Sequence, residues 1–403
     1  MSKVSFLCIA SYFKGEDFLK AAKQAGCTVC LLTSKKHDCK PWPWESIDDT
    51  FYVQDDGHDN WKMDDVIAGL SFVMRTRKID RIIALDDFDV EKGALLRETF
   101  RIPGMGQTTG RFFRDKLAMR IQAADAGINV PSFSALFNDE EINAYIAKTS
   151  APWLVKPRGE ASATGIQKAH SAEQLWQIIN SLGEKRHQYL VEQFRPGDVY
   201  HVDSLSFDRE VVFVRVSRYL STPMDVAHGG GIFRSVVVKF GSKDDKALQK
   251  MNQEVMDAFG MNYSASHTEF IKSREDGKYY FLETASRVGG ANLAEMVEIS
   301  SGINLWAEWA KLEAAVVKGE QYKVPEPRMD YAGIIVSLSR HQWPDSSGFT
   351  DKEICWRMKK EYHIGMIVKA QKEEKVIELL EGYAETIKSD FHASLPISNK
   401  HAS

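Results

Sequence analysis

Residues 153–166 read WLVKPRGEASATGI, an apolar run that ends at Lys156 and Pro157 and is followed by small, polar and charged residues. The run is typical of a buried strand. Because the loop after it carries almost no bulk, its backbone N–H groups can approach an anion closely while the Lys156 ammonium neutralises that anion. The stretch therefore predicts a phosphate-binding loop. Taken alone, it also fits a lysine that reaches solvent before a loop without function.

The loop is not a Walker A loop, because its lysine precedes the small residues instead of following them.

With 403 residues, the chain is longer than one hydrophobic core usually holds, so we expect two or three packed units. No apolar run comes near the roughly 18 residues of a membrane helix. The N-terminal apolar stretch is interpreted as a first strand and not as a signal peptide, which predicts a cytoplasmic protein without a membrane partner.

The net charge of −4 is spread over interspersed acids and bases, so the sequence offers no footprint for a nucleic-acid backbone. The five cysteines are expected to be reduced thiols. Cys27 and Cys30, with His37 and Cys39 downstream, would suit a metal site if taken alone. The β-rich run around them points positions 27 and 30 to opposite faces of a strand, so we interpret the four residues as unrelated.

The first hundred residues alternate short apolar runs with amphipathic helical patterns, which indicates βαβ units and a parallel sheet. We expect a Rossmann-like domain over residues 1–107. The stretch ASYFKGED (10–17) stands where a GxGxxG fingerprint would follow the first strand, which disfavours a dinucleotide there. A second unit is expected over 108–320, with a subdomain at about 130–195, and an α+β subdomain over 321–403.

Three glutamates lie on predicted strands further along the chain. Glu192, in YLVEQFRPG (189–197), suits a carboxylate that accepts from an exocyclic amine while the backbone of the next three residues meets the edge of a base. Glu269 and Glu283 lie on consecutive strands joined by REDGK, amid apolar neighbours. Burying two like charges is costly unless a cation neutralises them, and oxygen ligands favour Mg²⁺. A solvated strand face is the alternative for each glutamate.

The stretch RVSRYLSTPMDVAHGGGIFRS (215–235) places His228 before three glycines, with Arg215, Arg218 and Arg234 on the flanking strands. Guanidinium groups around such a loop can bind a carboxylate or an acyl phosphate. The alternative is a flexible hairpin tip with surface arginines. Both interpretations stay open for His228, and a functional one is favoured for Arg234.

Five motifs in order resemble the ATP-grasp superfamily: DKL (115–117), LVKP with its small-residue loop (154–165), LVEQF (190–194), HTEF (267–270) and LETASRVGG (282–290). More narrowly, the chain is similar to the carboxylate–amine ligases related to the L-amino-acid ligases, to carbamoyl-phosphate synthase and to biotin carboxylase. The resemblance runs from residue 1 to about residue 320. It implies an α/β ATP-grasp fold behind a Rossmann-like parallel-sheet domain.

The resemblance also implies how the chain binds ATP. Lys116 and Lys156 would contact the phosphates, the loop 159–165 would act as a mobile lid, and Glu192 would accept from the adenine amine. The nucleotide-binding residues expected on this basis are Lys116, Lys156, Gly159, Ser162, Ala163, Thr164, Glu192, Gln193, Phe194 and Arg195.

For the metal and the substrate, the resemblance implies that Glu269 and Glu283 hold Mg²⁺, with Mn²⁺ as an alternative. Arg287 would meet the transferred phosphoryl group or the substrate carboxylate, and VGG after it suits anion binding at a helix start. An ordinary surface ion pair is its alternative. The loop with His228 and Arg234 resembles the substrate-side loop of amino-acid ligases, so these two residues join Arg287 as expected catalytic residues.

Two positions depart from the family pattern. Ala285 stands where members usually carry an asparagine, which removes an oxygen from the second metal. Val199, flanked by Asp198, stands where an acid commonly binds the ribose. The contact to the ribose is therefore left open.

Together these inferences predict an ATP-dependent carboxylate–amine ligase that forms an amide through an acyl phosphate and releases ADP and phosphate. The expected partners are a small-molecule carboxylate and an amine, one of them an amino acid by resemblance. The alternatives are a bicarbonate-using carboxylase of the biotin or purine type and a non-catalytic ATP-binding sensor. The sequence does not fix the substrates or the oligomeric state, for which a homodimer is one option.

Overall fold

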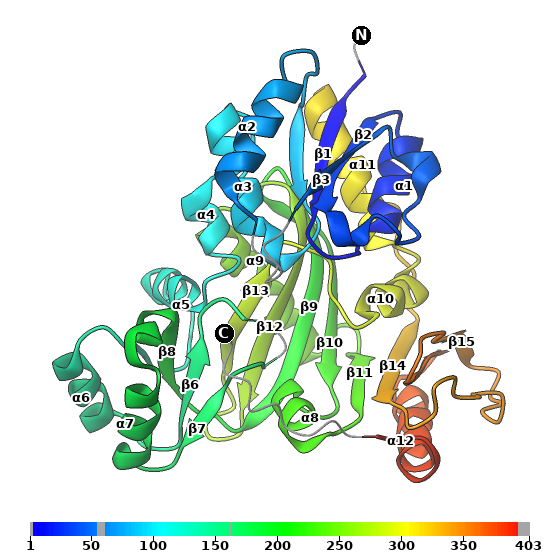
Figure 1. The fold of residues 1–403 in the computed structure, drawn as a ribbon. Coiled ribbons are helices and arrows are strands. Elements are labelled where there is room, and N and C mark those ends of the chain that lie inside the picture. Colours follow the sequence, from blue (N-terminus) through cyan, green and yellow to red (C-terminus); the bar gives the residue numbers. More distant parts are fainter. Residues whose placement is uncertain (1–2, 55–60, 161–162, 394–403) are drawn as a thin grey trace.

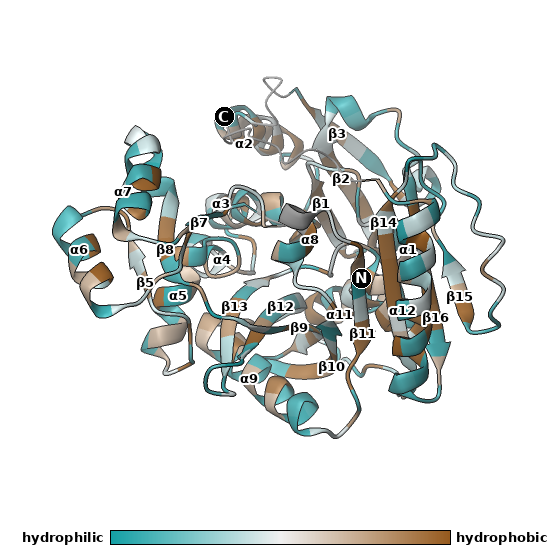
Figure 2. Ribbon diagram, turned by 90° about the horizontal axis from the view of Figure 1, so that it is seen from below, coloured by the Kyte–Doolittle hydropathy of each residue, from teal (hydrophilic) through white to brown (hydrophobic). Residues whose placement is uncertain are grey.

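The structure is a computed structural model that describes residues 3–54, 61–160 and 163–393. The described chain forms three sheets. The longest is central, and the other two flank it (Figure 1). Apolar residues concentrate in strands such as β14 and β16, whereas helices such as α1 and α9 carry many hydrophilic residues (Figure 2). In that part of the chain, no helix is both long and apolar enough to cross a bilayer.

The N-terminal sheet is parallel, with the strand order β3-β2-β1-β4. Alternate residues of β1 feed two cores: Phe6 and Cys8 pack with α1 and α11, whereas Leu7 and Ile9 pack with α2 and α3. A parallel sheet covered on both faces confirms the predicted Rossmann-like opening. Its elements are β1 (Ser5–Ala10), α1 (Glu16–Gln24), β2 (Thr28–Ser34), β3 (Asp49–Val53), α2 (Met63–Val73), β4 (Arg81–Ala84) and α3 (Val90–Phe100).

The cysteines of this domain are free thiols. Cys27 lies in the core beneath α1, whereas Cys30 lies in the core on the opposite face of the sheet. The interpretation of CTVC as two unrelated positions agrees with this placement.

A small antiparallel sheet follows, with the strand order β5-β8-β6-β7. It has its own core under α6 and α7 and lies to one side of the central sheet (Figure 1). Its elements are β5 (Phe133–Ala135), α6 (Asp139–Lys148), β6 (Trp153–Pro157), β7 (Gln167–Ala169), α7 (Ala172–Ser181) and β8 (Tyr189–Gln193). We call residues 133–193 the lid sheet unit. Helices α4 (Gln107–Arg111) and α5 (Lys116–Asp125) connect it to the first domain.

The central sheet has eight strands in the order β13-β12-β9-β10-β11-β14-β16-β15, and its paired strands are antiparallel. The long hairpin predicted around FDRE is β9 and β10. The strands are β9 (Gly197–Phe207), β10 (Glu210–Tyr219), β11 (Phe233–Val237), β12 (Ser264–Ser273), β13 (Tyr279–Ala285), β14 (Tyr331–Leu338), β15 (Ile354–Arg357) and β16 (His363–Ala370).

The last strands do not form a sheet of their own. β14, β16 and β15 extend the central sheet beyond β11, and α12 packs against β11, β14 and β16. The boundary drawn at residue 321 therefore stays a prediction. The remaining elements are α8 (Pro223–Gly229), α9 (Lys243–Phe259), α10 (Leu293–Ser301), α11 (Leu305–Lys318), α12 (Glu373–Asp390) and the 3₁₀ helices η1 (Lys35–His37), η2 (Trp44–Ser46), η3 (Asp87–Asp89) and η4 (Gly183–Gln188).

Candidate functional site

A cavity of about 630 Å³ lies between the lid sheet unit, the central sheet and the end of β4. A cavity of this size suits a nucleotide together with small substrates. It gathers side chains that are up to 200 residues apart in sequence, such as Asp87 and Arg287. The predicted site residues that line it are Lys116, Lys156, Ala163, Thr164, Glu192, Gln193, Phe194, Arg195, Glu269, Glu283 and Arg287.

Lys116 is the first residue of α5, and the carboxylate of Asp115 caps that helix by accepting from two N–H groups of its first turn. The same carboxylate pairs with Arg158 after β6, and the N–H of Lys116 donates to the Arg158 carbonyl at 2.9 Å. These contacts tie α5 to the lid sheet unit. The Nζ of Lys116 then lies 2.6 Å from the carbonyl oxygen of Glu160 and 2.7 Å from Oε2 of Glu283.

Glu192 lies on β8 and is held by two cations. Its Oε2 accepts from Nη2 and Nε of Arg120 at 2.8 and 3.1 Å, and its Oε1 pairs with Lys156. Burial opposes the charge, but Arg120 and then Lys156 lower the pKa of Glu192 below its usual value. Glu192 is thus ionised, and Lys156 lies on the lid strand facing it.

The backbone after Glu192 is partly engaged in the lid sheet. The N–H of Gln193 donates to the Ser132 carbonyl at 2.8 Å, and the N–H of Phe194 donates to the Pro152 carbonyl at 2.9 Å. These two amides cannot also donate to an adenine without breaking the sheet. The Phe194 ring lines the cavity and lies under Lys168, whose Nζ is 3.6 Å from the ring centroid.

Glu269 and Glu283 face each other across β12 and β13, in one register position of the ladder. Both line the cavity. Burial opposes the charge on Glu283, but Lys116 lowers its pKa to about 2. Oε1 of Glu269 accepts a hydrogen bond from the Tyr219 hydroxyl at 2.8 Å. The structure therefore brings together the two carboxylates that the sequence assigned to a metal.

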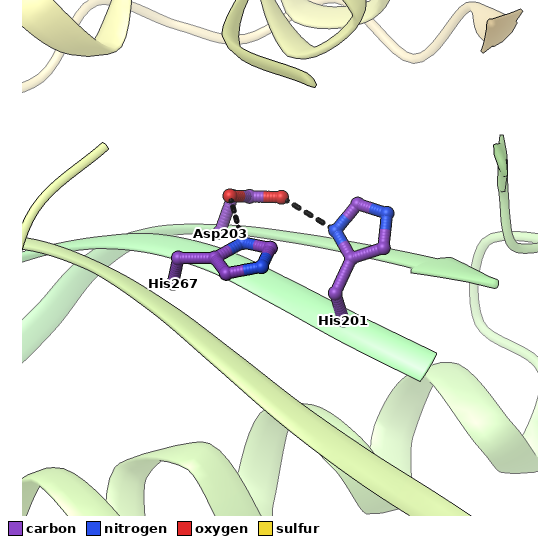
Figure 3. Close-up of side chains that lie close together, drawn as sticks. All are labelled: His201, Asp203 and His267. Atoms are coloured by element: carbon purple, nitrogen blue, oxygen red, sulfur yellow. Dashed lines mark hydrogen bonds and ion pairs between the residues drawn. The ribbon is translucent and has the colours of Figure 1, made fainter. Parts of the chain in front are cut away.

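Next to Glu269 lies a buried group that sequence analysis did not find. The carboxylate of Asp203 lies between two imidazoles, with one oxygen 2.8 Å from Nδ1 of His267 and the other 2.8 Å from Nδ1 of His201 (Figure 3). Burial opposes a charge on His267, but Asp203 and Glu269 raise its pKa to about 9. Burial opposes the charge on Asp203, but His267 and His201 hold the pKa of its carboxyl well below the usual range.

Arg287 lies after β13 and reaches the N-terminal domain. Its Nη2 is 2.5 Å from Oδ2 of Asp87 in η3, and its Nη1 donates to the Val288 carbonyl at 2.9 Å. Nε of Arg287 and Oδ1 of Asp87 are buried and have no hydrogen-bond partner among the described residues. A guanidinium with a donor to spare at the cavity wall can bind an anion. Asp87 follows a parallel strand, a signal that would have pointed to it.

Two predicted residues, Arg234 and Gly159, do not line this cavity, and two more lie outside the described part of the chain. Arg234 follows the cavity-lining Phe233 on β11, so strand alternation turns it to the other face, where its Nη2 lies 3.4 Å from Oγ of Ser221. The catalytic role predicted for Arg234 stays a prediction. Gly159 lines a second cavity of about 380 Å³ beside Arg158. Ser162 lies outside the described residues, and so does the side chain of His228.

Arg215 is also placed away from the cavity. It is buried under the Phe240 ring, with its guanidinium carbon 4.8 Å from the ring centroid, and its Nη2 donates to the Arg328 carbonyl. Burial lowers its pKa to about 10. Its role is in packing. The acid next to the ribose position, Asp198, pairs with Arg274 at 2.5 Å and does not line the cavity.

The donor set fits the nucleotide and the divalent ion that this fold family implies. Two carboxylates in one ladder position supply oxygen ligands, and two lysines on the opposite wall supply charge for phosphate oxygens. Arg120, which holds Glu192, was missed by sequence analysis. It lies four residues after Lys116 on the same helix, so the helical period places both on one face.

The sequence of the chain is similar to a family model and to curated proteins. The family model described as D-ala D-ala ligase C-terminus matches residues 123–221. An L-arginine-specific L-amino acid ligase of Bacillus subtilis is 27% identical over 264 residues, which cover 64% of this chain and 62% of the relative. A D-alanine–D-alanine ligase of Laribacter hongkongensis is 32% identical over 134 residues, 32% of this chain and 44% of the relative. The matches span less than two thirds of the length of these two curated relatives.

Solved structures match over nearly the whole chain. The L-amino acid ligase from Bacillus licheniformis superposes with a TM-score of 0.72 at 16% identity, covering 98% of this chain and all of the other. A biotin carboxylase from Campylobacter jejuni in a β,γ-ATP complex gives a TM-score of 0.66 at 14% identity, covering 94% of this chain and 90% of the other. At these identities the likeness concerns the fold. With its lid sheet and its central sheet, the chain has the ATP-grasp fold.

Proposed function

We propose that the chain is an ATP-dependent carboxylate–amine ligase that joins a carboxylate to an amine and releases ADP and phosphate. The observation that carries the proposal is one cavity with Lys116 and Lys156 on one side and Glu269 and Glu283, in one ladder position, on the other. The similarity to an L-amino acid ligase and to D-alanine–D-alanine ligases supports this class of reaction. An amino acid as one substrate rests on the same similarity.

In the proposed reaction, the γ-phosphoryl group of ATP passes to the substrate carboxylate, and the amine then displaces phosphate from the acyl phosphate. Lys156 and Lys116 neutralise the phosphate charge, and both are already within reach of carboxylates that a phosphate can replace as partners. A divalent ion held by Glu269 and Glu283, Mg²⁺ or Mn²⁺, would add charge neutralisation on the phosphate oxygens. Catalysis in this account is positioning and electrostatics.

Arg287 is assigned to the anionic oxygens of the substrate. Its guanidinium is held by Asp87 at 2.5 Å, and within the described part of the chain its Nε has no hydrogen-bond partner. The pair comes from the first domain and from the end of β13, so the substrate would bind where the two domains meet. A fixed guanidinium can hold a carboxylate during attack by the amine.

The nucleotide is assigned to the lid sheet unit. Glu192 is ionised and can accept from an amine, although it is shared with Arg120. The loop after Lys156 would close over the phosphates, and closure would keep water from the acyl phosphate. Ala163 and Thr164 of that loop line the cavity.

The test is a screen for phosphate release. The full chain is incubated with MgATP and with single L- and D-amino acids and their pairs, and phosphate, ADP and AMP are measured. The proposal expects amino-acid-dependent release of ADP and phosphate in equal amounts with formation of a dipeptide. Release that depends on bicarbonate and needs no amino acid would favour a carboxylase instead, and no release with any substrate in a protein that binds ATP would favour a sensor.

A further inference from the structure

The inner face of β12 and β13 carries a second pair of residues next to the two glutamates. In the register of the ladder, His267 lies opposite Ala285, just as Glu269 lies opposite Glu283. All four residues line the cavity. Ala285 has no ligand atom in its side chain, so of this pair only the His267 imidazole can coordinate a metal ion.

The orientation of the His267 ring is fixed from behind. Nδ1 of His267 lies 2.8 Å from Oδ1 of Asp203, whose other oxygen is held by His201 (Figure 3). Gly289 covers this contact, since a Cβ there would lie 2.7 Å from the same Asp203 oxygen and 3.0 Å from Nδ1 of His267. The proton on Nδ1 therefore points to Asp203, and Nε2 is the ring nitrogen left for another partner.

That second nitrogen lies beside a predicted metal ligand. Nε2 of His267 is 3.7 Å from Oε1 of Glu269. Two ligand atoms bound at about 2.1 Å to one ion are about 3.0–3.4 Å apart, so a small rotation of Glu269 brings the two into coordinating distance. A histidine whose other nitrogen donates to a carboxylate is the usual arrangement of metal-binding imidazoles in proteins.

His201, Asp203 and His267 also lie close enough to one another to hold an ion, with their ligand atoms within 4.8 Å. Their facing atoms, however, are used in hydrogen bonds. Nδ1 of both histidines pairs with Asp203, and Nε2 of His201 is 2.7 Å from Oγ of Ser235. His201 and Asp203 are fully buried. We therefore interpret these two residues as the support of His267 and not as ligands.

We propose that Nε2 of His267, together with Glu269, ligates a divalent metal ion in the cavity, so that this site has mixed nitrogen and oxygen ligands. The inference rests on the proposed function, because a divalent ion is expected in this cavity only if the chain uses ATP. Binding of the ion replaces the proton on Nε2, which leaves to solvent. An imidazole ligand favours Mn²⁺, Co²⁺ or Zn²⁺ over Mg²⁺, because Mg²⁺ prefers oxygen.

The test uses Mn²⁺ as the probe. The full chain is loaded with Mn²⁺ and a non-hydrolysable ATP analogue, and electron spin echo envelope modulation records coupling between Mn²⁺ and nitrogen. We expect ¹⁴N coupling of a directly bound imidazole in the wild type, a change to the ¹⁵N pattern when histidine is ¹⁵N-labelled, and loss of the coupling in His267→Asn. His201→Asn is the matched control and keeps the coupling.

A Mn²⁺ titration followed by the free-ion signal gives a second readout. The ratio of Mg²⁺ to Mn²⁺ dissociation constants should fall at least about tenfold in His267→Asn, because the nitrogen ligand that discriminates between the ions is gone. Bound Mn²⁺ without histidine coupling in the wild type overturns the proposal, and so does coupling that persists in a folded His267→Asn protein. If His267→Asn does not fold, the labelled wild type and His201→Asn still decide.

The two proposals fail in different ways. Amino-acid-dependent ADP release with no histidine coupling leaves the ligase function standing and refutes the ligand. If histidine coupling is seen but no substrate gives a product, the ligase function is refuted and His267 remains a metal ligand.

Discussion

The two walls of the cavity hold their charges in different ways. On the wall formed by α5 and the lid sheet unit, the lid wall, Glu192 is neutralised by Arg120 and Lys156, and Lys116 reaches across the cavity to Glu283 on the central sheet. On the sheet wall, Asp203 accepts from two imidazoles, and Glu269 accepts from the Tyr219 hydroxyl. Long lysines on the first wall can exchange a carboxylate for a phosphate, whereas the side chains of the second wall are held by hydrogen bonds to one another across paired strands. We infer that the lid wall moves with the nucleotide and that the sheet wall keeps its backbone geometry.

The largest effect is expected from the lid wall. Lys156→Ala should lower amino-acid-dependent ADP release by about 10²-fold or more, since removing one preorganised charge-stabilising donor typically costs about that much. Arg120 still neutralises Glu192, so the variant should fold. Steady-state kinetics measure the turnover, and a melting curve shows whether the variant folds. The control is Lys250→Ala, at an exposed position on α9. Turnover within a factor of about 3 of the wild type in a folded variant contradicts the assignment.

Arg120→Ala should cost the most stability. Arg120 and Glu192 are 1% and 2% exposed, and removing one partner of such a pair leaves a buried charge, at a cost of about 3–5 kcal/mol. Lys156→Ala should cost less, because Arg120 remains beside Glu192. Urea unfolding compares the two, with Arg111→Ala, whose side chain is 61% exposed, as control. A loss below about 1 kcal/mol for Arg120→Ala would mean that Glu192 does not depend on it.

The charge on His267, on the sheet wall, should make the free energy of unfolding depend on pH. The pKa of His267 is raised to about 9 in the folded state, above the unfolded value of about 6.5. The stabilisation is therefore complete below pH 6.5 and is lost as pH rises through about 9. In metal-free buffer, the stability difference between the wild type and His267→Gln should shrink by up to about 3 kcal/mol over that window. A difference that does not change with pH contradicts a charged His267.

The smallest effect is expected at Ala285. Mg²⁺ tolerates water in place of a protein ligand, so the native site should work but need free Mg²⁺ beyond the amount that saturates ATP. Ala285→Asn adds an oxygen at that ladder position and should lower the free Mg²⁺ for half-maximal rate by about 2–5-fold. Rates measured at fixed MgATP and varied free Mg²⁺ decide. An unchanged requirement means that position 285 does not govern metal binding.

Much of the fold was predictable, because its signals are local. The alternation of apolar runs and helices predicted the parallel sheet of β1 to β4. The turn sequence FDRE between two alternating segments predicted the β9–β10 hairpin. That β14, β16 and β15 would extend the central sheet was not predictable, since pairing between distant strands leaves no mark on either strand alone.

The site divides in the same way. Motif residues such as Lys116, Glu269 and Arg287 line the cavity, as the motif order suggested. Asp203, by contrast, lies 64 residues before its partner His267 and looks like an ordinary strand residue in sequence. Arg234 follows Phe233, which lines the cavity, and its own absence from the lining was not predictable, because the face that a strand residue occupies depends on register.

Trapping of the acyl phosphate tests the proposed ligase reaction at its decisive step. With the carboxylate substrate found in the screen, hydroxylamine replaces the amine, and hydroxamate, ADP and AMP are quantified. The account predicts hydroxamate and ADP in equal amounts, because hydroxylamine attacks the acyl phosphate, and it predicts that Lys156→Ala lowers both together. AMP and pyrophosphate in place of ADP would show that the carboxylate is adenylated and would contradict the account.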